Sequence, residues 1–345
     1  MPTSTDFSYV IPVRWTGDEN GRDALADYLD QLVCWCADVI VVDGSPAETF
    51  AANASRWGSR IRHVAPDRAH QALMRKVSGV LTGIDLARHD RVVLADDDVR
   101  YDEAGLIRVV AALEHHDLVR PQNFFSPMPW HAVWDTSRTL LNRSTGQDFP
   151  GTLGVRRSTV LAMGGYSGDV MFENLELIRT VKAHGGTVVS PLDLFVRRLP
   201  PTSGHFWRQR TRQAYDDFAI PARMLLWLSI LPALVSAVMR RRTKPALLAA
   251  AACVALAERG RRRSAGTEVF PWIASVLAPV WVLERAICAW LAVIQRARFG
   301  GVRYGDAIIR VAAHSSRYLR RKAVTTPALR PEAIAVAAYS GDPRE

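Results

Sequence analysis

Short apolar, β-rich runs alternate with helical patterns over the first 205 residues, and this alternation constrains the fold more than any other feature. It is typical of a largely parallel sheet with helices on its faces. The predicted strands are Ser8–Arg14, Asp38–Asp43, Arg60–Val64, Arg91–Ala95, Leu118–Arg120, Gly151–Val155 and Thr187–Val189. The predicted helices are Arg22–Val33, Ala69–Ala87, Glu103–His115 and Phe172–His184. The first part of the chain is therefore predicted to be α/β.

The composition of the chain changes after residue 219. Residues 1–205 carry 21 Lys/Arg against 25 Asp/Glu, whereas the remainder carries 23 against 9 and so holds the whole positive excess. Its apolar runs are Met224–Met239, Pro245–Ala257 and Val269–Ile294, and its basic clusters are Arg240–Lys244, Arg259–Arg263 and Arg296–Arg303. Basic clusters beside apolar runs favour an anionic membrane surface over nucleic acid, which prefers basic residues interleaved with stacking aromatics. Buried helices of a second soluble domain are the alternative.

These observations predict an α/β domain over residues 1–218, membrane-associated helices over 219–324 and a flexible tail over 325–345. The apolar runs fall short of a clean span, so we expect Pro232 and Pro279 to bend two of them into re-entrant hairpins. All three basic clusters would then face the cytoplasm. The four cysteines show no disulfide framework, and Met1–Val10 shows no signal peptide. We therefore expect attachment to the cell membrane with the α/β domain in the cytoplasm.

Three consecutive carboxylates, Asp96–Asp98, follow the buried strand Arg91–Ala95. Adjacent carboxylates repel one another, so they either point into water at a turn or are compensated by a cation. Asp43 follows another strand and precedes the turn Gly44-Ser45-Pro46. Because ligands of open α/β sheets sit beyond the carboxyl ends of the strands, both groups are expected to border one crevice. Asp43 would accept the N–H of a pyrimidine base there, or would only cap the helix that begins near Pro46.

Together these segments resemble the family 2 glycosyltransferases over roughly residues 7 to 215. The similarity runs from the strand Tyr9–Val13 through Asp43-Gly44-Ser45 and Asp96–Asp98, which stands at the family's DxD motif, to Gly164-Gly165-Tyr166. It implies a GT-A, Rossmann-like fold, a UDP- or GDP-linked sugar donor, Mg²⁺ or Mn²⁺, and inversion at the anomeric carbon. By this resemblance Asp43 holds the base, Asp96 contacts the donor and Asp98 ligates the metal, and we expect donor binding to depend on a divalent ion held through Asp96 and Asp98. His205 would complete the metal shell or is an ordinary loop histidine.

The chain departs from the family at two places. Asn174 stands where the catalytic Asp is expected and cannot act as a base, so Glu173 is the predicted base, with Asp169 and Glu176 as alternatives. The Gln-x-x-Arg-Trp motif of membrane-linked members is incomplete: Gln209 and Arg212 are present, but Gln213 replaces the Trp.

Several further residues are predicted to contact the substrates. Arg210 or Arg212 would neutralise the leaving diphosphate, or both belong to a basic helix lying on the membrane. The further predicted donor contacts are Pro12, Lys76, Asp97 and Gln209. Trp130, His131 and Trp134 belong to a predicted aromatic loop, Phe124–Trp134, that would line an acceptor groove.

The leading hypothesis is a glycosyltransferase whose acceptor is a lipid or a polyprenyl-linked hydroxyl, without nucleic acid as a partner. A sugar-phosphate nucleotidyltransferase is the second hypothesis, although the segment Pro12–Gly17 holds one glycine where that class has a glycine-rich loop. A non-catalytic scaffold on the same fold is the third, motivated by Asn174 and Gln213.

Overall fold

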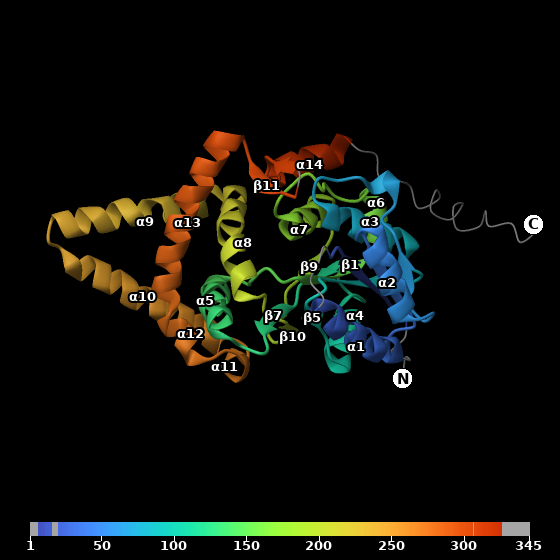
Figure 1. Ribbon diagram of the computed structural model, residues 1–345. Coiled ribbons are helices and arrows are strands. Elements are labelled where there is room, and N and C mark those ends of the chain that lie inside the picture. The colour runs from blue at the N-terminus through green and yellow to red at the C-terminus, as the bar shows by residue number, and fades with distance from the viewer. Residues whose placement is uncertain (1–5, 16–19, 306, 326–345) are drawn as a thin grey trace, which may run out of the picture.

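A seven-stranded sheet forms the centre of the computed structural model, which describes residues 6–15, 20–305 and 307–325 (Figure 1). Its strands, in spatial order, are β3 (Arg62–Val64), β2 (Asp38–Asp43), β1 (Ser8–Val13), β4 (Arg91–Ala95), β8 (Thr152–Arg156), β6 (Leu118–Val119) and β9 (Val188–Val189). β1 to β4 are parallel, β8 is antiparallel to both neighbours, and β6 and β9 are parallel. All seven predicted strands are confirmed, and their ends lie within two residues of the prediction.

Helices cover both faces of this sheet, because successive side chains of a strand point to opposite faces. Tyr9 and Ile11 of β1 belong to one apolar cluster, while Val10 belongs to the other. The first cluster includes side chains of α1 (Asn20–Trp35) and α4 (Glu103–Ala112), and the second those of α3 (Arg75–Leu86) and α7 (Glu173–Ala183). A further helix, α2 (Ala47–Trp57), follows β2. The four predicted helices are confirmed, but α3 begins only at Arg75, after a 3₁₀ turn at Arg68–His70.

A second, three-stranded sheet is formed by β5 (Val99–Arg100), β10 (Phe195–Arg198) and β7 (Gln122–Phe125). Leu199 N donates to Asp98 O, so the end of β10 is held directly beside the acidic segment that follows β4. The predicted aromatic loop Phe124–Trp134 is wrong in part, because β7 continues to Phe125 and α5 (Trp130–Thr145) begins at Trp130.

A helical part follows the α/β part, and α5 connects the two. It consists of α8 (Ser203–Tyr215), α9 (Pro221–Met239), α10 (Thr243–Arg262), α11 (Gly266–Val269), α12 (Trp272–Val276) and α13 (Ala278–Phe299), with a 3₁₀ turn at Asp216–Ala219 after α8. Leu140 of α5 shares an apolar cluster with Ala257, Phe270, Ala274 and Ala278. A domain boundary after residue 218 remains a prediction, although α5 packs among helices that come after it.

α9 and α10 form the arms of a helical hairpin that projects from the rest of the molecule and turns at Arg240–Arg242 (Figure 1). Pro232 lies inside α9, which continues to Met239, and Pro279 lies in the first turn of α13. The expected chain reversals at these two prolines are therefore wrong. The hairpin is made instead from two complete helices. By length and composition α9 and α13 are both able to cross a bilayer, and only 6% of the apolar window of α9 is buried.

The last described segment returns to the α/β part. β11 (Val302–Tyr304) and β12 (Ala307–Ile309) form a small hairpin, and α14 (Ser316–Thr325) packs against α7. Met171 N and Phe172 N donate to Val311 O and Ala312 O. Part of the predicted membrane-associated region thus packs beside the sheet instead. Of the predicted tail, residues 326–345 lie outside the described residues.

Candidate active site

A cavity of about 1240 Å³ opens where the carboxyl ends of β1, β2 and β4 face α8, α9 and α13. The parallel register aligns Val13 with Asp43 and Val10 with Leu94, so these strands end at one edge of the sheet. Ten of the eleven predicted site residues line this cavity: Pro12, Asp43, Lys76, Asp96, Asp97, Asp98, Glu173, His205, Gln209 and Arg212. Arg210 does not. The structure therefore brings together side chains that lie as far as 200 residues apart.

The three consecutive carboxylates have different partners. Asp96 Oδ1 lies 2.5 Å from Lys76 Nζ, and Asp98 Oδ2 accepts a 2.8 Å hydrogen bond from Arg198 Nε. Asp97 Oδ2 accepts from the indole of Trp15 at 2.7 Å. Arg198 also reaches Asp96 Oδ2 at 3.4 Å, so its guanidinium lies between the two aspartates of the acidic motif. Lys76 and Arg198 thus compensate the charge that the sequence places here.

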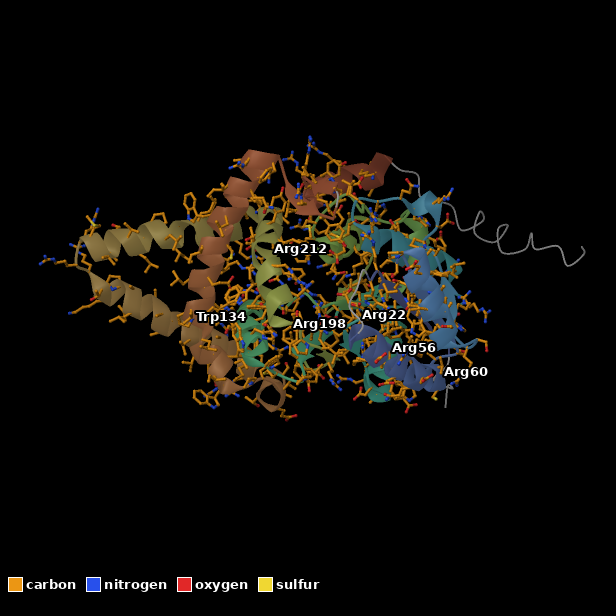
Figure 2. The ribbon with its side chains drawn as sticks, in the orientation of Figure 1. Arg22, Arg56, Arg60, Trp134, Arg198 and Arg212 are labelled. Atoms are coloured by element: carbon orange, nitrogen blue, oxygen red, sulfur yellow. The ribbon has the colours of Figure 1, made fainter. Side chains whose placement is uncertain are left out.

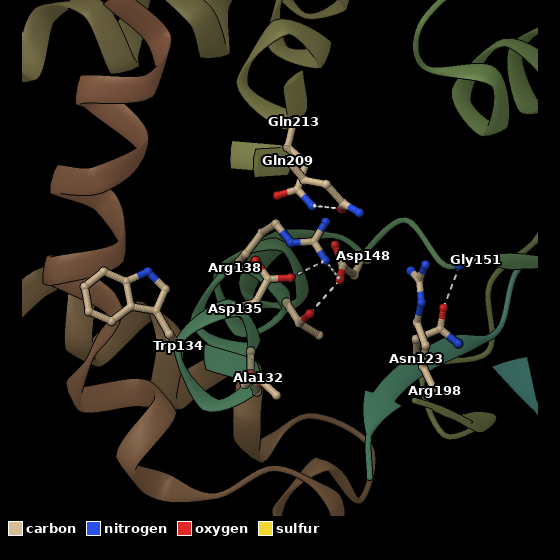
Figure 3. A network of polar contacts seen from close by, with 12 residues as sticks. Asn123, Ala132, Trp134, Asp135, Arg138, Asp148, Gly151, Arg198, Gln209 and Gln213 are labelled. Carbon is tan, nitrogen blue, oxygen red and sulfur yellow. Dashed lines mark hydrogen bonds and ion pairs between the residues drawn. The ribbon is translucent and has the colours of Figure 1, made fainter. Parts of the chain in front are cut away.

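Gly151 allows this close packing. Asp96 N donates to Gly151 O, and a Cβ atom at residue 151 would lie 2.6 Å from Asp96 Oδ2 and 3.1 Å from Arg198 Cζ. The backbone of Gly151 is held in turn by Asn123, whose Oδ1 accepts from Gly151 N at 2.6 Å (Figure 3). A larger residue would displace the carboxylate or the guanidinium.

Asp98 has the properties of a ligand for a divalent cation. Its Oδ1 is buried without a hydrogen-bond partner, and burial raises the pKa of this carboxyl to about 6 despite the neighbouring Arg198. Within the described ranges no three His, Cys, Asp or Glu side chains lie close enough together to hold a metal ion. The predicted set of Asp96, Asp98 and His205 is therefore not preassembled. Mg²⁺ commonly uses one or two carboxylates and completes its shell with phosphate and water oxygens, which fits the residues present.

Lys76 connects the acidic motif to the predicted base. Its Nζ lies 2.8 Å from Glu173 Oε1, at the first residue of α7, in addition to its contact with Asp96. Burial disfavours the Lys76 cation, but Asp96 and Glu173 outweigh it and hold the pKa of Lys76 above its usual range. The helix N-terminus also favours a negative Glu173. Asn174 instead donates to Pro150 O at 2.9 Å.

The two alternative bases lie elsewhere. Glu176 is fully buried, and its oxygens accept from the backbone and the ring of His314, both at 2.7 Å. Asp169 is exposed, accepts from Leu73 N and is not among the residues that line the cavity. Glu173 is the carboxylate of the three that the cavity contains.

Asp43 is buried in the cavity wall with its oxygens already engaged. Oδ1 accepts from Ser45 N at 2.8 Å, and Oδ2 contacts Asn53 Nδ2 at 2.7 Å and His63 Nε2 at 3.0 Å. Burial favours the neutral carboxyl, but these hydrogen bonds outweigh it and hold the pKa of Asp43 below its usual value. The alternative role as a helix cap is wrong, because Asp43 forms a turn with Ser45 and α2 has no side-chain cap. The ring of His63 stacks on Phe50, which lines the cavity, at 4.0 Å.

Arg210 is a correction to the sequence prediction. Its guanidinium is buried and pairs with Asp135 Oδ1 at 2.7 Å and with both oxygens of Glu284, so its donors are taken up in joining α5, α8 and α13. It cannot also neutralise a diphosphate in the cavity. Arg212, two residues further along α8, does line the cavity, and its guanidinium lies 5.8 Å from the ring of Tyr304. Figure 2 shows Arg212 and Arg198 between α13 and the central sheet.

The aromatic acceptor groove is also not formed as predicted. His131 is buried and bonds Pro201 O at 2.7 Å, while Trp134 donates to Glu284 Oε2 at 3.1 Å. Trp130 packs against Phe206 and Trp207. These rings hold α5 against α8 and α13, and none of them lines the cavity. Arg138 of the same helix does line it, between Asp135 and Asp148 (Figure 3).

Sequence reasoning missed Arg198 and a group of polar residues that also line the cavity, Asp216, Asp217, Arg223 and Arg285. The pair Arg197-Arg198 at the end of an apolar run was a usable signal, since a charged strand end next to a site is unusual. Arg285 interrupts the apolar run Val269–Ile294. A charged residue inside such a run costs free energy, so it usually has a function or a partner.

No family model matches the chain, and no curated protein matches it either. Among solved structures, it is similar to a mannosyltransferase from Pyrobaculum calidifontis in complex with GDP-Man and Mn²⁺, with 16% identity, coverage of 83% of this chain and 87% of that chain, and a TM-score of 0.47. Mannosyl-3-phosphoglycerate synthase from Rubrobacter xylanophilus follows, with 15% identity, 60% and 71% coverage and a TM-score of 0.42. Glucosyl-3-phosphoglycerate synthase from Mycobacterium tuberculosis, with Mn²⁺, UDP and its product, shows 18% identity, 61% and 78% coverage and a TM-score of 0.40.

Proposed function

We propose that this chain is an inverting glycosyltransferase of the GT-A type, resembling family 2, that moves a sugar from a UDP- or GDP-linked donor to an acceptor hydroxyl. One observation carries the proposal. Lys76 joins Asp96, in the acidic motif after β4, to Glu173, a separate carboxylate at the start of α7, inside one cavity. The proposed donor site and the proposed base for the acceptor would then lie side by side, as group transfer between two bound substrates requires.

The reaction follows from this arrangement. The acceptor oxygen attacks the anomeric carbon from the face opposite the nucleotide, and its proton passes to the carboxylate of Glu173. The bond between the anomeric carbon and the diphosphate oxygen breaks, and its electron pair leaves with the nucleoside diphosphate. Arg212 neutralises this leaving charge from α8. Lys76 holds the carboxylate of Glu173 in position before the acceptor binds.

Mg²⁺ or Mn²⁺ is the proposed cofactor, held by Asp98 with Asp96. When bound, the ion supplies charge stabilisation to the diphosphate. Asp98 offers a buried oxygen that has no other partner, which supports this role. His205 lines the same cavity and remains a predicted further ligand. Arg198 competes for both aspartates, so it has to give way or turn toward the phosphates when the cation enters.

A lipid or polyprenyl-linked acceptor is the proposed partner, with the chain attached to the cytoplasmic face of the cell membrane. Exposed apolar side chains on α9, α10 and α13 support this attachment, among them Leu225, Val238, Leu247, Leu248 and Ile294, each at least 54% exposed. The cavity wall itself includes Trp227 of α9 and Trp281 of α13. A hydrophobic acceptor would therefore reach the base from the same helices that enter the membrane surface.

The two ends of α10 favour attachment in the plane of the membrane over a full crossing. Arg240–Lys244 lies at the tip of the hairpin and Arg259–Arg263 at the other end of α10, about 30 Å away for a helix of 20 residues. A crossing would place the tip cluster outside, against the tendency of basic segments to stay inside. In the plane of the interface, both clusters reach anionic headgroups.

Nucleotide binding tests the proposed function directly. We expect Mn²⁺ to tighten the binding of UDP or GDP to the parent protein, and Asp98→Asn to abolish that increment, measured by calorimetric titration with and without Mn²⁺. Asp193→Asn is the matched control, because Asp193 is exposed and paired with Arg108 outside the cavity. Equal metal dependence in Asp98→Asn and in the control would contradict the assignment.

A further inference from the structure

The part of the cavity wall that α9 and α13 form is basic and is hardly used by the reaction above. We call the side chains Arg223, Trp227, Trp281 and Arg285 the basic end; all four line the cavity. Arg223 and Trp227 come from the first two turns of α9, and Trp281 and Arg285 from the first two turns of α13. The two helices that leave the body for the proposed membrane surface thus meet at this end.

The basic end is one compact group. Asp217 lies between the two arginines, with Oδ1 at 2.6 Å from Arg223 Nη2 and Oδ2 at 3.7 Å from Arg285 Nη1. The guanidinium of Arg285 lies 5.0 Å from the centre of the Trp281 ring, which meets Trp227 edge-on at 5.9 Å. A single ligand group can therefore contact several of these donors.

Two shielded carboxylate oxygens here, Asp216 Oδ1 and Asp217 Oδ2, lack a hydrogen-bond donor, whereas five shielded nitrogen atoms lack a hydrogen-bond acceptor. The five nitrogen atoms are Nε of Arg223, Nε and Nη1 of Arg285, and the indole Nε1 of Trp227 and Trp281. Arg285 and Trp281 are only 4% and 3% exposed. Leaving a buried donor unsatisfied costs about 1–3 kcal/mol each, so five in one place point to a missing acceptor. Since Arg and Trp side chains only donate, the ligand has to be rich in acceptors.

The charges favour an anion. Asp217 is the carboxylate that directly faces the two arginines, so one negative charge meets two positive charges. Glu284 and Asp135 also interact with Arg285, but they are paired with Arg210 and Arg138. Asp216 is a further carboxylate nearby. Burial, together with the charges of Glu173 and Asp217, raises the pKa of Asp216 to about 8, so it is mainly neutral near pH 7. Arg212 adds a further positive charge to this side of the cavity. Asp216 interacts electrostatically with both Glu173 and Arg285, so the basic end lies near the proposed base.

We propose that the basic end binds a phosphate monoester group carried by the acceptor. This deepens the proposed function and rests on it. A phosphate monoester carries close to two negative charges and three acceptor oxygens in a tetrahedral arrangement, which suits donors from two helices that do not share a plane. Leu225 and Leu226 of α9 and Leu283 and Ile287 of α13 are exposed next to the basic end along the chain, so an apolar tail has a surface on which to continue.

Binding of farnesyl phosphate and of farnesol, in the same detergent, separates the phosphate from the tail. We expect the parent to bind farnesyl phosphate at least about tenfold more tightly than farnesol, as charge-assisted hydrogen bonds imply. Arg223→Gln should remove most of this difference. Trp227→Phe, which keeps an aromatic ring and loses one donor, should lower it by about threefold. The matched control is Trp290→Phe on α13, because Trp290 donates to Leu228 O and does not line the cavity.

Nucleotide affinity in the presence of Mn²⁺ shows whether each variant is folded, since the acidic motif is untouched. The proposal is overturned if the parent binds farnesyl phosphate and farnesol alike, or if the difference survives in both Arg223→Gln and Trp227→Phe. Another outcome is that the parent protein prefers farnesyl phosphate and still shows no Mn²⁺-dependent nucleotide binding. That result would support phosphate binding at the basic end and contradict the proposed glycosyl transfer. Glucose 6-phosphate identifies the source of the phosphate: weaker binding than farnesyl phosphate supports a lipid acceptor, and equal binding supports a water-soluble one.

Discussion

Glu173 combines two properties of a base: it lies in the cavity, and Lys76 Nζ holds its carboxylate in position at 2.8 Å. Glu173→Gln keeps the size of the side chain and removes its ability to take a proton. We expect turnover to fall by at least about a hundredfold while donor affinity changes little, as for the loss of a general base. Steady-state rates and nucleotide titrations measure the two effects. Asp169→Asn is the control, and a rate near the parent's in Glu173→Gln would exclude Glu173 as the base.

Asp216 makes stability depend on pH. Its folded-state pKa is about 8, raised by burial first, whereas an unfolded Asp titrates near 3.9. Between these values the folded chain holds a proton that the unfolded chain releases, so the contribution of Asp216 to stability falls as pH rises from about 4 to about 8. Asp216→Asn should therefore gain stability over the parent as pH rises from 5 to 8, with no further gain above. Urea unfolding at several pH values measures this difference, and a constant difference would contradict it.

At the scale of elements, the contact between α5 and α10 joins the α/β part to the hairpin. Gly260 makes this contact possible, because a Cβ atom there would lie only 1.9 Å from Leu140 O of α5. We expect Gly260→Ala to lower the free energy of unfolding by about 1–3 kcal/mol, since backbone atoms have to move to accept the methyl group. Gly21→Ala in α1, where nothing lies within 4 Å of the added atom, is the control and should be neutral or slightly stabilising. Equal stability of both variants would show that the helices part without cost.

Arg143 gives the same junction a polar component. Its buried guanidinium, 0% exposed, donates to Gln122 Oε1 in β7, to Leu192 O and to Arg263 O just after α10. These bonds tie α5 to the second sheet and to the end of the hairpin. The orientation of the hairpin relative to the cavity is therefore set by packing and by hydrogen bonds together.

At the scale of the whole molecule, the proposed membrane attachment predicts a dependence on charge at the hairpin tip. Changing Arg240, Arg241 and Arg242 together to Gln should weaken binding to vesicles containing anionic lipid by up to about a hundredfold, at roughly 1 kcal/mol per arginine. Sedimentation with vesicles measures it. The control is the same change at Arg22, Arg56 and Arg60, which lie at the opposite end of the molecule (Figure 2). Equal effects of the two triple changes would indicate attraction by net charge alone and contradict attachment through the hairpin.

Local patterns in the sequence were sufficient for the α/β part. Strand periodicity, apolar runs and the carboxylates at the end of β4 can each be recognised from residues that are adjacent in the sequence. Parallel strands that end at one edge of a sheet then bring Asp43 and Asp96–Asp98 together. The seven strands, four of the helices between them and ten of eleven predicted site residues followed from these rules. The sequence by itself thus determined the location of the cavity and the acidic motif within it.

The tertiary structure decided which charges are available for chemistry. Arg210 forms ion pairs with Asp135 and Glu284, whereas Arg212, two residues further on, lines the cavity. The two side chains differ because positions two apart on a helix point in different directions. Arg198 forms an ion pair with Asp98, which lies 100 residues earlier in the chain, and no local sequence pattern predicts this pairing. The hairpin likewise turns between α9 and α10 and not at Pro232, which lies inside the continuous helix α9. Pairing of charges across distant segments is a property of the folded chain alone.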